Sequence, residues 1–166
     1  MSEPAAHKRS FVLFRLGQEH YGLPVSNVGS IIRYEPSTPV PGAPDVVIGV
    51  INLRGRVIPV VDLKRRFSGS AFVPGPQSRI VVAEAASGPL GIAVDAASEV
   101  TSFSDEDIRP VPEGILGPET ASAFSGMVER EGGLVVLLDL EEALPRREYA
   151  AVATDADERK EEVDDV

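Results

Sequence analysis

The residue types that most often perform catalysis are scarce in this chain of 166 residues. It has no cysteine, which excludes thiol catalysis, disulfide bonds and thiolate metal sites, and only two histidines, His7 and His20. His20 lies beside a predicted turn and is expected to be an exposed strand residue. The consecutive acids Asp105, Glu106 and Asp107 could ligate a cation, but acids in a row after a serine are more typical of a turn. We therefore predict no metal, no cofactor and no catalytic residues.

The short motifs of common enzyme classes are missing as well. The sequence has no glycine-rich loop with phosphate-binding spacing, no Gly-x-Ser-x-Gly and no His-Glu-x-x-His. A nucleophile, a base and oxyanion donors cannot be assembled from these residues, so an enzyme acting on small substrates is the disfavoured alternative.

Acidic residues outnumber basic ones, with 26 Asp and Glu against 16 Lys and Arg and a formal net charge of −10. This balance argues against binding to nucleic acid or to an anionic membrane surface. Residues 155–166 carry −5 of that charge, and we predict flexible tails at residues 1–9 and 150–166. The opposite bias occurs over residues 54–66, which hold five basic residues and one acid. These are Arg54, Arg56, Lys64, Arg65 and Arg66, with Asp62.

The N-terminal residues contain no apolar segment of the kind found in signal peptides. No run approaches the roughly 20 apolar residues that are needed to cross a bilayer. We therefore expect a cytoplasmic protein without direct membrane insertion.

Short apolar runs separated by glycine turns indicate an all-β protein built from small barrels. The runs at residues 11–16 and 20–25 form a predicted hairpin, and a third strand is expected over residues 28–34. Four prolines between residues 36 and 44 mark an extended loop. Residues 47–53 and 56–62 flank Arg54-Gly55, a tight turn in which glycine can adopt a positive φ.

The second half of the chain repeats this order. Residues 47–63 align without gaps on residues 124–140, so that Gly49 matches Gly126 and Asp62 matches Asp139. Residues 11–14 and 21–25 align on residues 80–83 and 90–94. The offset changes from 69 to 77 residues, which places the length difference in one connecting loop.

We therefore predict two five-stranded barrels packed on each other within a single domain at residues 10–145. The barrels are expected to pack on each other because each half is too small for a stable core of its own. The first barrel is expected at residues 11–67, a linker at 68–78 and the second barrel at 79–140. Residues 139–149 are expected to form a short closing helix with Asp139 as its N-cap.

The two halves differ most in charge at one turn, which reads Asn52-Leu53-Arg54-Gly55-Arg56 in the first half and Glu129-Arg130-Glu131-Gly132-Gly133 in the second. An isolated Arg-Gly would be a solvated hairpin tip. Here the guanidinium of Arg54 could present its donors to a carboxylate or carbonyl group of a partner.

With this turn and the strands on either side of it, the sequence resembles the CheW family, the coupling proteins of bacterial chemotaxis. The match rests on ordered segments across roughly residues 10–145. The main one is residues 49–63, GVINLRGRVIPVVDL, preceded by VPGAP at residues 40–44. The others lie at residues 11–17, 21–22, 94–95, 98–100, 108–112 and 137–140.

The resemblance implies two SH3-like barrels and a non-enzymatic adaptor or scaffold. The implied partners are the regulatory domain of a CheA-type histidine kinase and the cytoplasmic tip of chemoreceptors, with assembly into membrane-associated receptor arrays. The implied partner-binding residues are Arg54, Asn52, Val28, Ser30 and Gly49. For Val28 and Gly49 the structural alternatives are a core strand residue and a bulge or packing contact.

One departure from the family concerns Ser30, because many relatives have a glutamate there that is well placed to pair with the signature arginine. Arg54 is then expected either to lack this partner or to use Asp45 or Glu35. A related binding module of a non-flagellar chemosensory pathway, such as surface motility, pili or biofilm control, is the alternative function.

Overall fold

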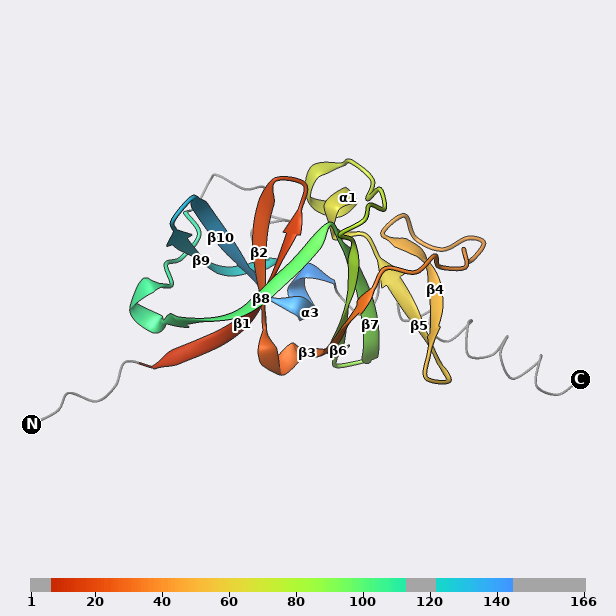
Figure 1. Cartoon of the computed structure of the whole chain (residues 1–166), viewed down its shortest axis with the longest axis horizontal. Helices are drawn as coiled ribbons and strands as arrows, with labels where there is room; N and C mark the ends of the chain where they lie inside the picture. The colour runs from red at the N-terminus through yellow and green to blue at the C-terminus, as the bar shows by residue number, and fades with distance from the viewer. Residues whose placement is uncertain (1–6, 113–121, 145–166) are drawn as a thin grey trace, which may run out of the picture.

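The computed structural model describes residues 7–112 and 122–144, which form ten strands in two five-stranded sheets (Figure 1). We call the sheet with order β8-β1-β2-β10-β9 barrel A and the sheet with order β3-β6-β7-β5-β4 barrel B. The strands of barrel A are β1 (Lys8–Leu16), β2 (Glu19–Pro24), β8 (Ala96–Ser104), β9 (Phe124–Arg130) and β10 (Gly133–Leu138). Those of barrel B are β3 (Val28–Arg33), β4 (Val47–Leu53), β5 (Arg56–Val61), β6 (Arg79–Ala85) and β7 (Gly88–Val94).

Each sheet is closed by a bridge from the segment that follows one outer strand to the other outer strand. In barrel B the segment after β3 reaches β4, where Thr38 and Val50 exchange backbone hydrogen bonds of 2.8 and 2.9 Å. In barrel A the segment after β8 reaches β9, where Arg109 and Met127 exchange bonds of 2.9 and 2.8 Å. The predicted fold class, two five-stranded barrels, is therefore confirmed.

The predicted barrel boundaries at residues 11–67 and 79–140 are wrong, because the two halves exchange hairpins. The chain forms β1 and β2 of barrel A and passes through the 3-10 turn η1 (Val25–Asn27). It then builds all of barrel B and returns to barrel A through Asp95. Residues 68–78, predicted as a linker between barrels, lie within barrel B, between α1 (Leu63–Ser68) and β6.

Parallel pairing joins the exchanged hairpins to the rest of each barrel. Strand β10 pairs parallel with β2 and places Leu137 opposite Gly22, and β5 pairs parallel with β7 and places Val60 opposite Gly91. These two pairs are equivalent under the offsets of 69 and 77 residues in the sequence. The internal repeat thus extends to strand register, although the sequence could not show which hairpin joins which barrel.

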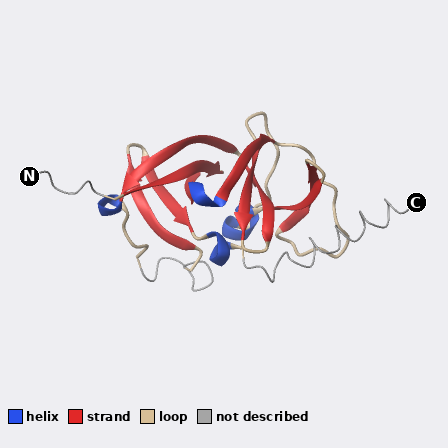
Figure 2. Cartoon of the chain, turned by 90° about the horizontal axis from the view of Figure 1, so that it is seen from below, coloured by secondary structure: helices blue, strands red, loops and turns tan. Residues whose placement is uncertain are grey.

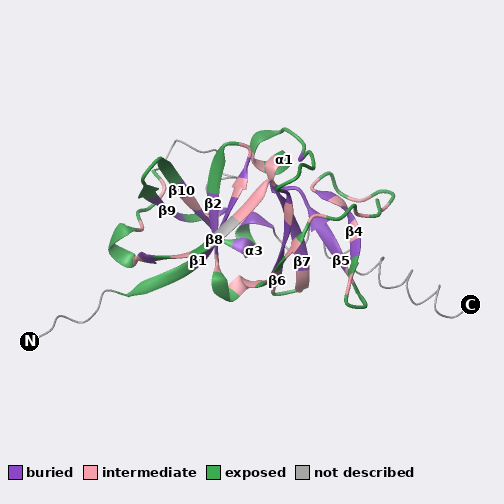
Figure 3. Ribbon diagram, in the orientation of Figure 1, coloured by how far each residue is buried: buried purple, intermediate pink, exposed green. Residues whose placement is uncertain are grey.

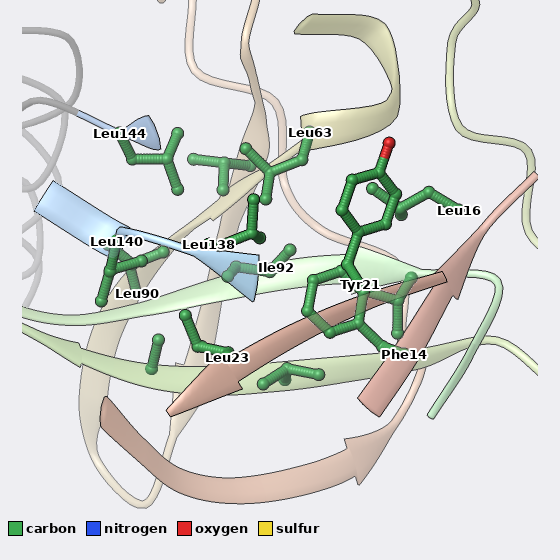
Figure 4. Close-up of a cluster of buried hydrophobic side chains, with 14 of the residues drawn as sticks. Phe14, Leu16, Tyr21, Leu23, Leu63, Leu90, Ile92, Leu138, Leu140 and Leu144 are labelled. Atoms are coloured by element: carbon green, nitrogen blue, oxygen red, sulfur yellow. The ribbon is translucent and has the colours of Figure 1, made fainter. Parts of the chain in front are cut away.

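The apolar side chains form three clusters, because neighbouring residues of one strand point to opposite faces. In β6, Ile80 and Val82 face the interior of barrel B, whereas Val81 and Ala83 face a cluster shared by both barrels. The core strands are consequently buried on both faces (Figure 3). Figure 4 shows the shared cluster, whose labelled members come from both barrels. They are Phe14, Leu16, Tyr21, Leu23, Leu63, Leu90, Ile92, Leu138, Leu140 and Leu144.

Helices are short, and most lie between the two sheets (Figure 2). Helix α1 was not predicted; its N-cap is Asp62, whose carboxylate accepts from the backbone N–H of Arg65. Asp139 caps α3 (Leu140–Ala143) in the same way, as predicted. The remainder of the predicted closing helix, residues 145–149, and the tail at 150–166 lie outside the described residues.

At the N-terminus, β1 begins at Lys8, so residues 8 and 9 belong to a strand and not to the predicted tail. The backbone of Arg9 is paired with Phe103 on β8.

Candidate partner-binding surfaces

The turn between β4 and β5 carries the candidate arginine in an uncommon backbone conformation. Arg54 has φ 52° and Gly55 has φ 83°, the combination of two positive φ values that defines a type I′ hairpin turn. Within the described residues, Arg54 is the only residue other than glycine with a positive φ. Asn52 supports the turn through its Oδ1, which accepts a hydrogen bond of 3.0 Å from the Gly55 N–H. Asn-Gly is the preferred pair in such turns, so an arginine at this position costs backbone energy.

The guanidinium of Arg54 is exposed and makes no ion pair with any residue of the described part of the chain. Neither of the two expected substitutes for the missing glutamate is used. Asp45 instead lies 3.9 Å from Arg65, and Glu35 has no ion pair among the described residues. The donors of Arg54 are therefore directed to solvent, where a partner can reach them.

The positive segment of the sequence separates into two places in space. Strand β5 (Arg56–Val61) runs between the turn that holds Arg54 and the helix α1 that holds Lys64, Arg65 and Arg66. Six strand residues span roughly 20 Å. The two groups of basic residues thus do not form one patch.

Val28 and Ser30 lie on β3, at the opposite end of the strand order from β4. Both side chains are half-buried, and Val28 packs against the shared apolar cluster. Ser30 is paired with Val82 on β6. Across the described ranges no side-chain hydrogen bond or ion pair joins Ser30 to Arg54, so the structure does not connect these two candidates directly.

Gly49 is buried beside the bridge that closes barrel B. A Cβ atom at this position would lie 2.5 Å from the carbonyl oxygen of Thr38 and 2.7 Å from Oγ of Ser37. Its repeat equivalent, Gly126, stands in the same relation to Arg109, with a distance of 3.0 Å to the carbonyl oxygen. This burial supports the structural interpretation of Gly49.

The junction between the barrels contains contacts that the sequence did not reveal. A cavity of about 420 Å³ is lined by residues of both barrels, including Arg15, Lys64 and Asp95. Lys64, which the sequence singled out only as one of the basic residues at 54–66, lies with its Nζ 3.7 Å from Oδ2 of Asp95. In the sequence, charge alone does not distinguish Lys64 from Arg65, and only the fold brings Lys64 to Asp95.

Tyr21 is the centre of an aromatic group within the shared cluster. Its ring stacks on Phe14, Phe67 and Phe124 at centroid distances of 5.7 to 6.3 Å. Its hydroxyl donates a hydrogen bond of 2.6 Å to Oε2 of Glu19. Burial, together with this bond to a carboxylate, raises the pKa of Tyr21 far above its ordinary value, so the phenol stays neutral.

Other chemistry is absent from the described ranges 7–112 and 122–144. No group of three or more His, Asp or Glu side chains there could hold a metal ion. Asp105, Glu106 and Asp107 form the exposed 3-10 turn η2 (Asp105–Asp107), and His20 is an exposed residue of β2, as predicted. None of the helices in this part of the chain is long and apolar enough to span a membrane.

Two closed barrels that present an exposed arginine turn define a small-barrel binding module. Residues 10–148 match the CheW-like domain, and the chain belongs to that family. It is 36% identical over 143 residues to the chemotaxis protein CheW of Rhizobium meliloti, covering 86% of this chain and 92% of the relative. It is 31% identical over 155 residues to the protein FrzA of Myxococcus xanthus, covering 92% and 96%.

A solved structure agrees with the fold. The scaffolding protein TtCheW from Thermoanaerobacter tengcongensis superposes with a TM-score of 0.72 and 29% sequence identity, covering 84% of this chain and 91% of that one. Family membership confirms the resemblance noted in the sequence and identifies the chain as a non-enzymatic scaffold of chemotaxis signalling.

Proposed function

We propose that this chain joins the cytoplasmic tip of chemoreceptors to the regulatory domain of a CheA-type histidine kinase, in arrays on the cytoplasmic side of the membrane. Two barrels give two separate outer surfaces on one rigid body, which suits a protein that holds two partners at once. No chemistry is required of it, because a scaffold acts through the geometry that it imposes on its partners.

The observation that carries the proposal is the conformation of Arg54. This residue occupies a left-handed position that glycine or asparagine would fill at lower cost, and its guanidinium has no internal ion pair in the described chain. Backbone strain that is retained at an exposed position is a sign of function and not of folding. A guanidinium held in this way can form a bidentate contact with a partner's carboxylate.

The test uses pull-down and titration with a receptor cytoplasmic fragment and a kinase regulatory domain. We expect Arg54→Glu to leave the fold intact and to weaken the ternary complex, because the exposed donors are replaced by a negative charge. The matched control is Glu131→Arg, a charge reversal at the equivalent turn of barrel A, which should leave the complex unchanged. Full kinase activation by folded Arg54→Glu protein would show that this arginine is not a contact residue.

A second variant tests whether the backbone strain at Arg54 is retained for binding. Arg54→Asn creates the preferred Asn-Gly turn, so the free energy of unfolding should rise by about 1 kcal/mol. The same variant should bind its partners more weakly because it lacks the guanidinium. Arg54→Asn protein that is both less stable and fully active would contradict the assignment.

A further inference from the structure

Two carboxylates at the barrel junction have a role that the partner surfaces do not explain. We infer that Asp95 and Glu141 are positioning residues: Asp95 binds the β1–β2 turn of barrel A, Glu141 binds the β6–β7 turn of barrel B, and together they fix the rotation of one barrel relative to the other. The consequence for signalling rests on the proposed function, because a fixed rotation matters only when two partners are held at once.

Asp95 is the single residue between β7 of barrel B and β8 of barrel A. Its Oδ2 accepts a hydrogen bond of 2.5 Å from the N–H of Gly17 in the β1–β2 turn, and its own N–H donates to the carbonyl of Arg15 at 2.9 Å. The same Oδ2 lies 3.7 Å from Nζ of Lys64 on α1. Asp95 therefore ties the first turn of barrel A to the helix of barrel B.

The second contact repeats the first with different residues. Glu141 on α3 accepts through Oε1 a hydrogen bond of 2.8 Å from the N–H of Ala86, which lies in the β6–β7 turn of barrel B. The repeat offsets of 69 and 77 residues make Ala86 the counterpart of Gly17, and Glu141 the counterpart of Lys64. In both places a carboxylate accepts from a hairpin turn of one barrel beside a short helix of the other, α1 after β5 in the first case and α3 after β10 in the second.

The remaining side-chain contacts between the barrels are mainly apolar, and the two hydrogen-bonded carboxylates add directional restraints to them. The driving force for apolar burial is non-directional, and although interdigitated side chains of the shared cluster also resist rotation, they tolerate small shifts more readily than a hydrogen bond does. Hydrogen bonds to charged acceptors have preferred distances and angles. The β1–β2 turn and the β6–β7 turn lie at opposite ends of the junction (Figure 1), so two such bonds together resist rotation.

The test measures the orientation directly and needs no partner. Because the chain has no cysteine, Arg33→Cys on β3 and Glu129→Cys on β9 allow one exposed spin label on each barrel. Pulsed dipolar spectroscopy then reports the distance distribution between the labels. We expect Asp95→Ala with Glu141→Ala to shift the distribution or broaden it about twofold, whereas Asp95→Asn, which can still accept from Gly17, should have a smaller effect.

The matched controls are Asp107→Ala and Glu142→Ala, which remove exposed carboxylates of η2 and α3 and should leave the distribution unchanged. Circular dichroism establishes that each variant is folded, and the single variants Asp95→Asn and Glu141→Gln serve if the double variant does not fold. A distribution identical to that of the parent in the folded variants overturns the positioning role.

Binding assays then connect orientation to coupling. The double variant should bind each partner alone within about twofold of the parent, and the ternary complex should weaken by about tenfold, the factor that corresponds to one charge-assisted hydrogen bond. Altered orientation with an unchanged ternary complex overturns the link to coupling. Failure of the unsubstituted parent to bind receptor and kinase overturns the proposed function instead, and leaves the spectroscopic result standing.

Discussion

Gly49 is the position where a structural and a functional interpretation can be separated most sharply. In the substitution Gly49→Ala, the new methyl group would lie 2.5 Å from the carbonyl oxygen and 2.8 Å from the carbonyl carbon of Thr38. Contacts of carbon with backbone atoms normally begin near 3.4 Å, so the segment around Thr38 has to move by nearly 1 Å. That movement pulls apart the bridge to Val50, which closes barrel B.

The expected destabilisation follows from these contacts. The bridge consists of two backbone hydrogen bonds, each with a net contribution of about 1 kcal/mol, and overpacking against the backbone adds about 1 kcal/mol or more. We therefore expect Gly49→Ala to lower the free energy of unfolding by about 3 kcal/mol. Gly126→Ala should cost less, about 1 to 2 kcal/mol, because its closest neighbour is a side-chain atom, Cγ2 of Ile108 at 2.9 Å, and the carbonyl oxygen of Arg109 lies at 3.0 Å.

Urea unfolding followed by circular dichroism measures both differences. Gly75→Ala is the control, because the nearest atom to its new Cβ is Oγ of Ser78 at 3.9 Å and the effect should stay within about 0.5 kcal/mol. At a temperature where Gly49→Ala is folded, its binding to receptor and kinase should equal that of the parent. Unchanged stability with lost binding would refute the structural interpretation and make Gly49 a contact residue.

Two further predictions concern the helix cap and the buried phenol. Asp62→Ala removes the cap of α1 and also leaves the N–H of Phe72 without its acceptor at 2.8 Å, so in urea titrations it should lower the free energy of unfolding by about 3 kcal/mol. Asp139→Ala removes only a cap and should cost about 1 kcal/mol. Equal losses for the two variants would contradict this reasoning. The raised pKa of Tyr21 stabilises the fold fully at pH values below the ordinary phenol pKa of about 10, and this contribution is lost as the pH rises above it. Tyr21→Phe should therefore show a shallower decline in thermal stability between pH 9 and about pH 11, and an identical decline would exclude the buried phenol as its cause.

The local elements of this fold were predictable because they depend on neighbouring residues. Short apolar runs separated by glycine turns predicted the strands, and Arg54-Gly55 predicted the turn between β4 and β5. The matched Gly49 and Gly126 indicated a duplication, and both lie beside equivalent closing bridges. Helix α1 was missed because its six residues, LKRRFS, carry too short a pattern to show helical periodicity.

The partition of strands between barrels was not predictable from one sequence. Apolar strands that are buried on both faces are chemically similar, so each could pair with several neighbours. Strands β5 and β10 both consist mainly of branched apolar residues. The sequence pattern would therefore be the same whether β2 paired with β10, as it does, or with β5. The contacts of Asp95 and Glu141 depend on this partition, so they could not be predicted before the pairing of the strands was known.

The exchange of hairpins explains how one duplicated scaffold can hold two different partners. Each barrel contains strands from both halves of the sequence, so substitutions in either half affect the stability of both barrels. The core side chains of the two halves therefore have to remain complementary in size and shape. The hairpin tips are free of that constraint, and there the halves differ: Arg54-Gly55 on barrel B stands where Glu131-Gly132 stands on barrel A. Opposite charges at equivalent tips disfavour binding of the same partner to both barrels. Because the barrels are joined by directional contacts as well as an apolar core, a partner bound at the Arg54 tip and an unlike partner bound elsewhere on the molecule would be held at a fixed angle.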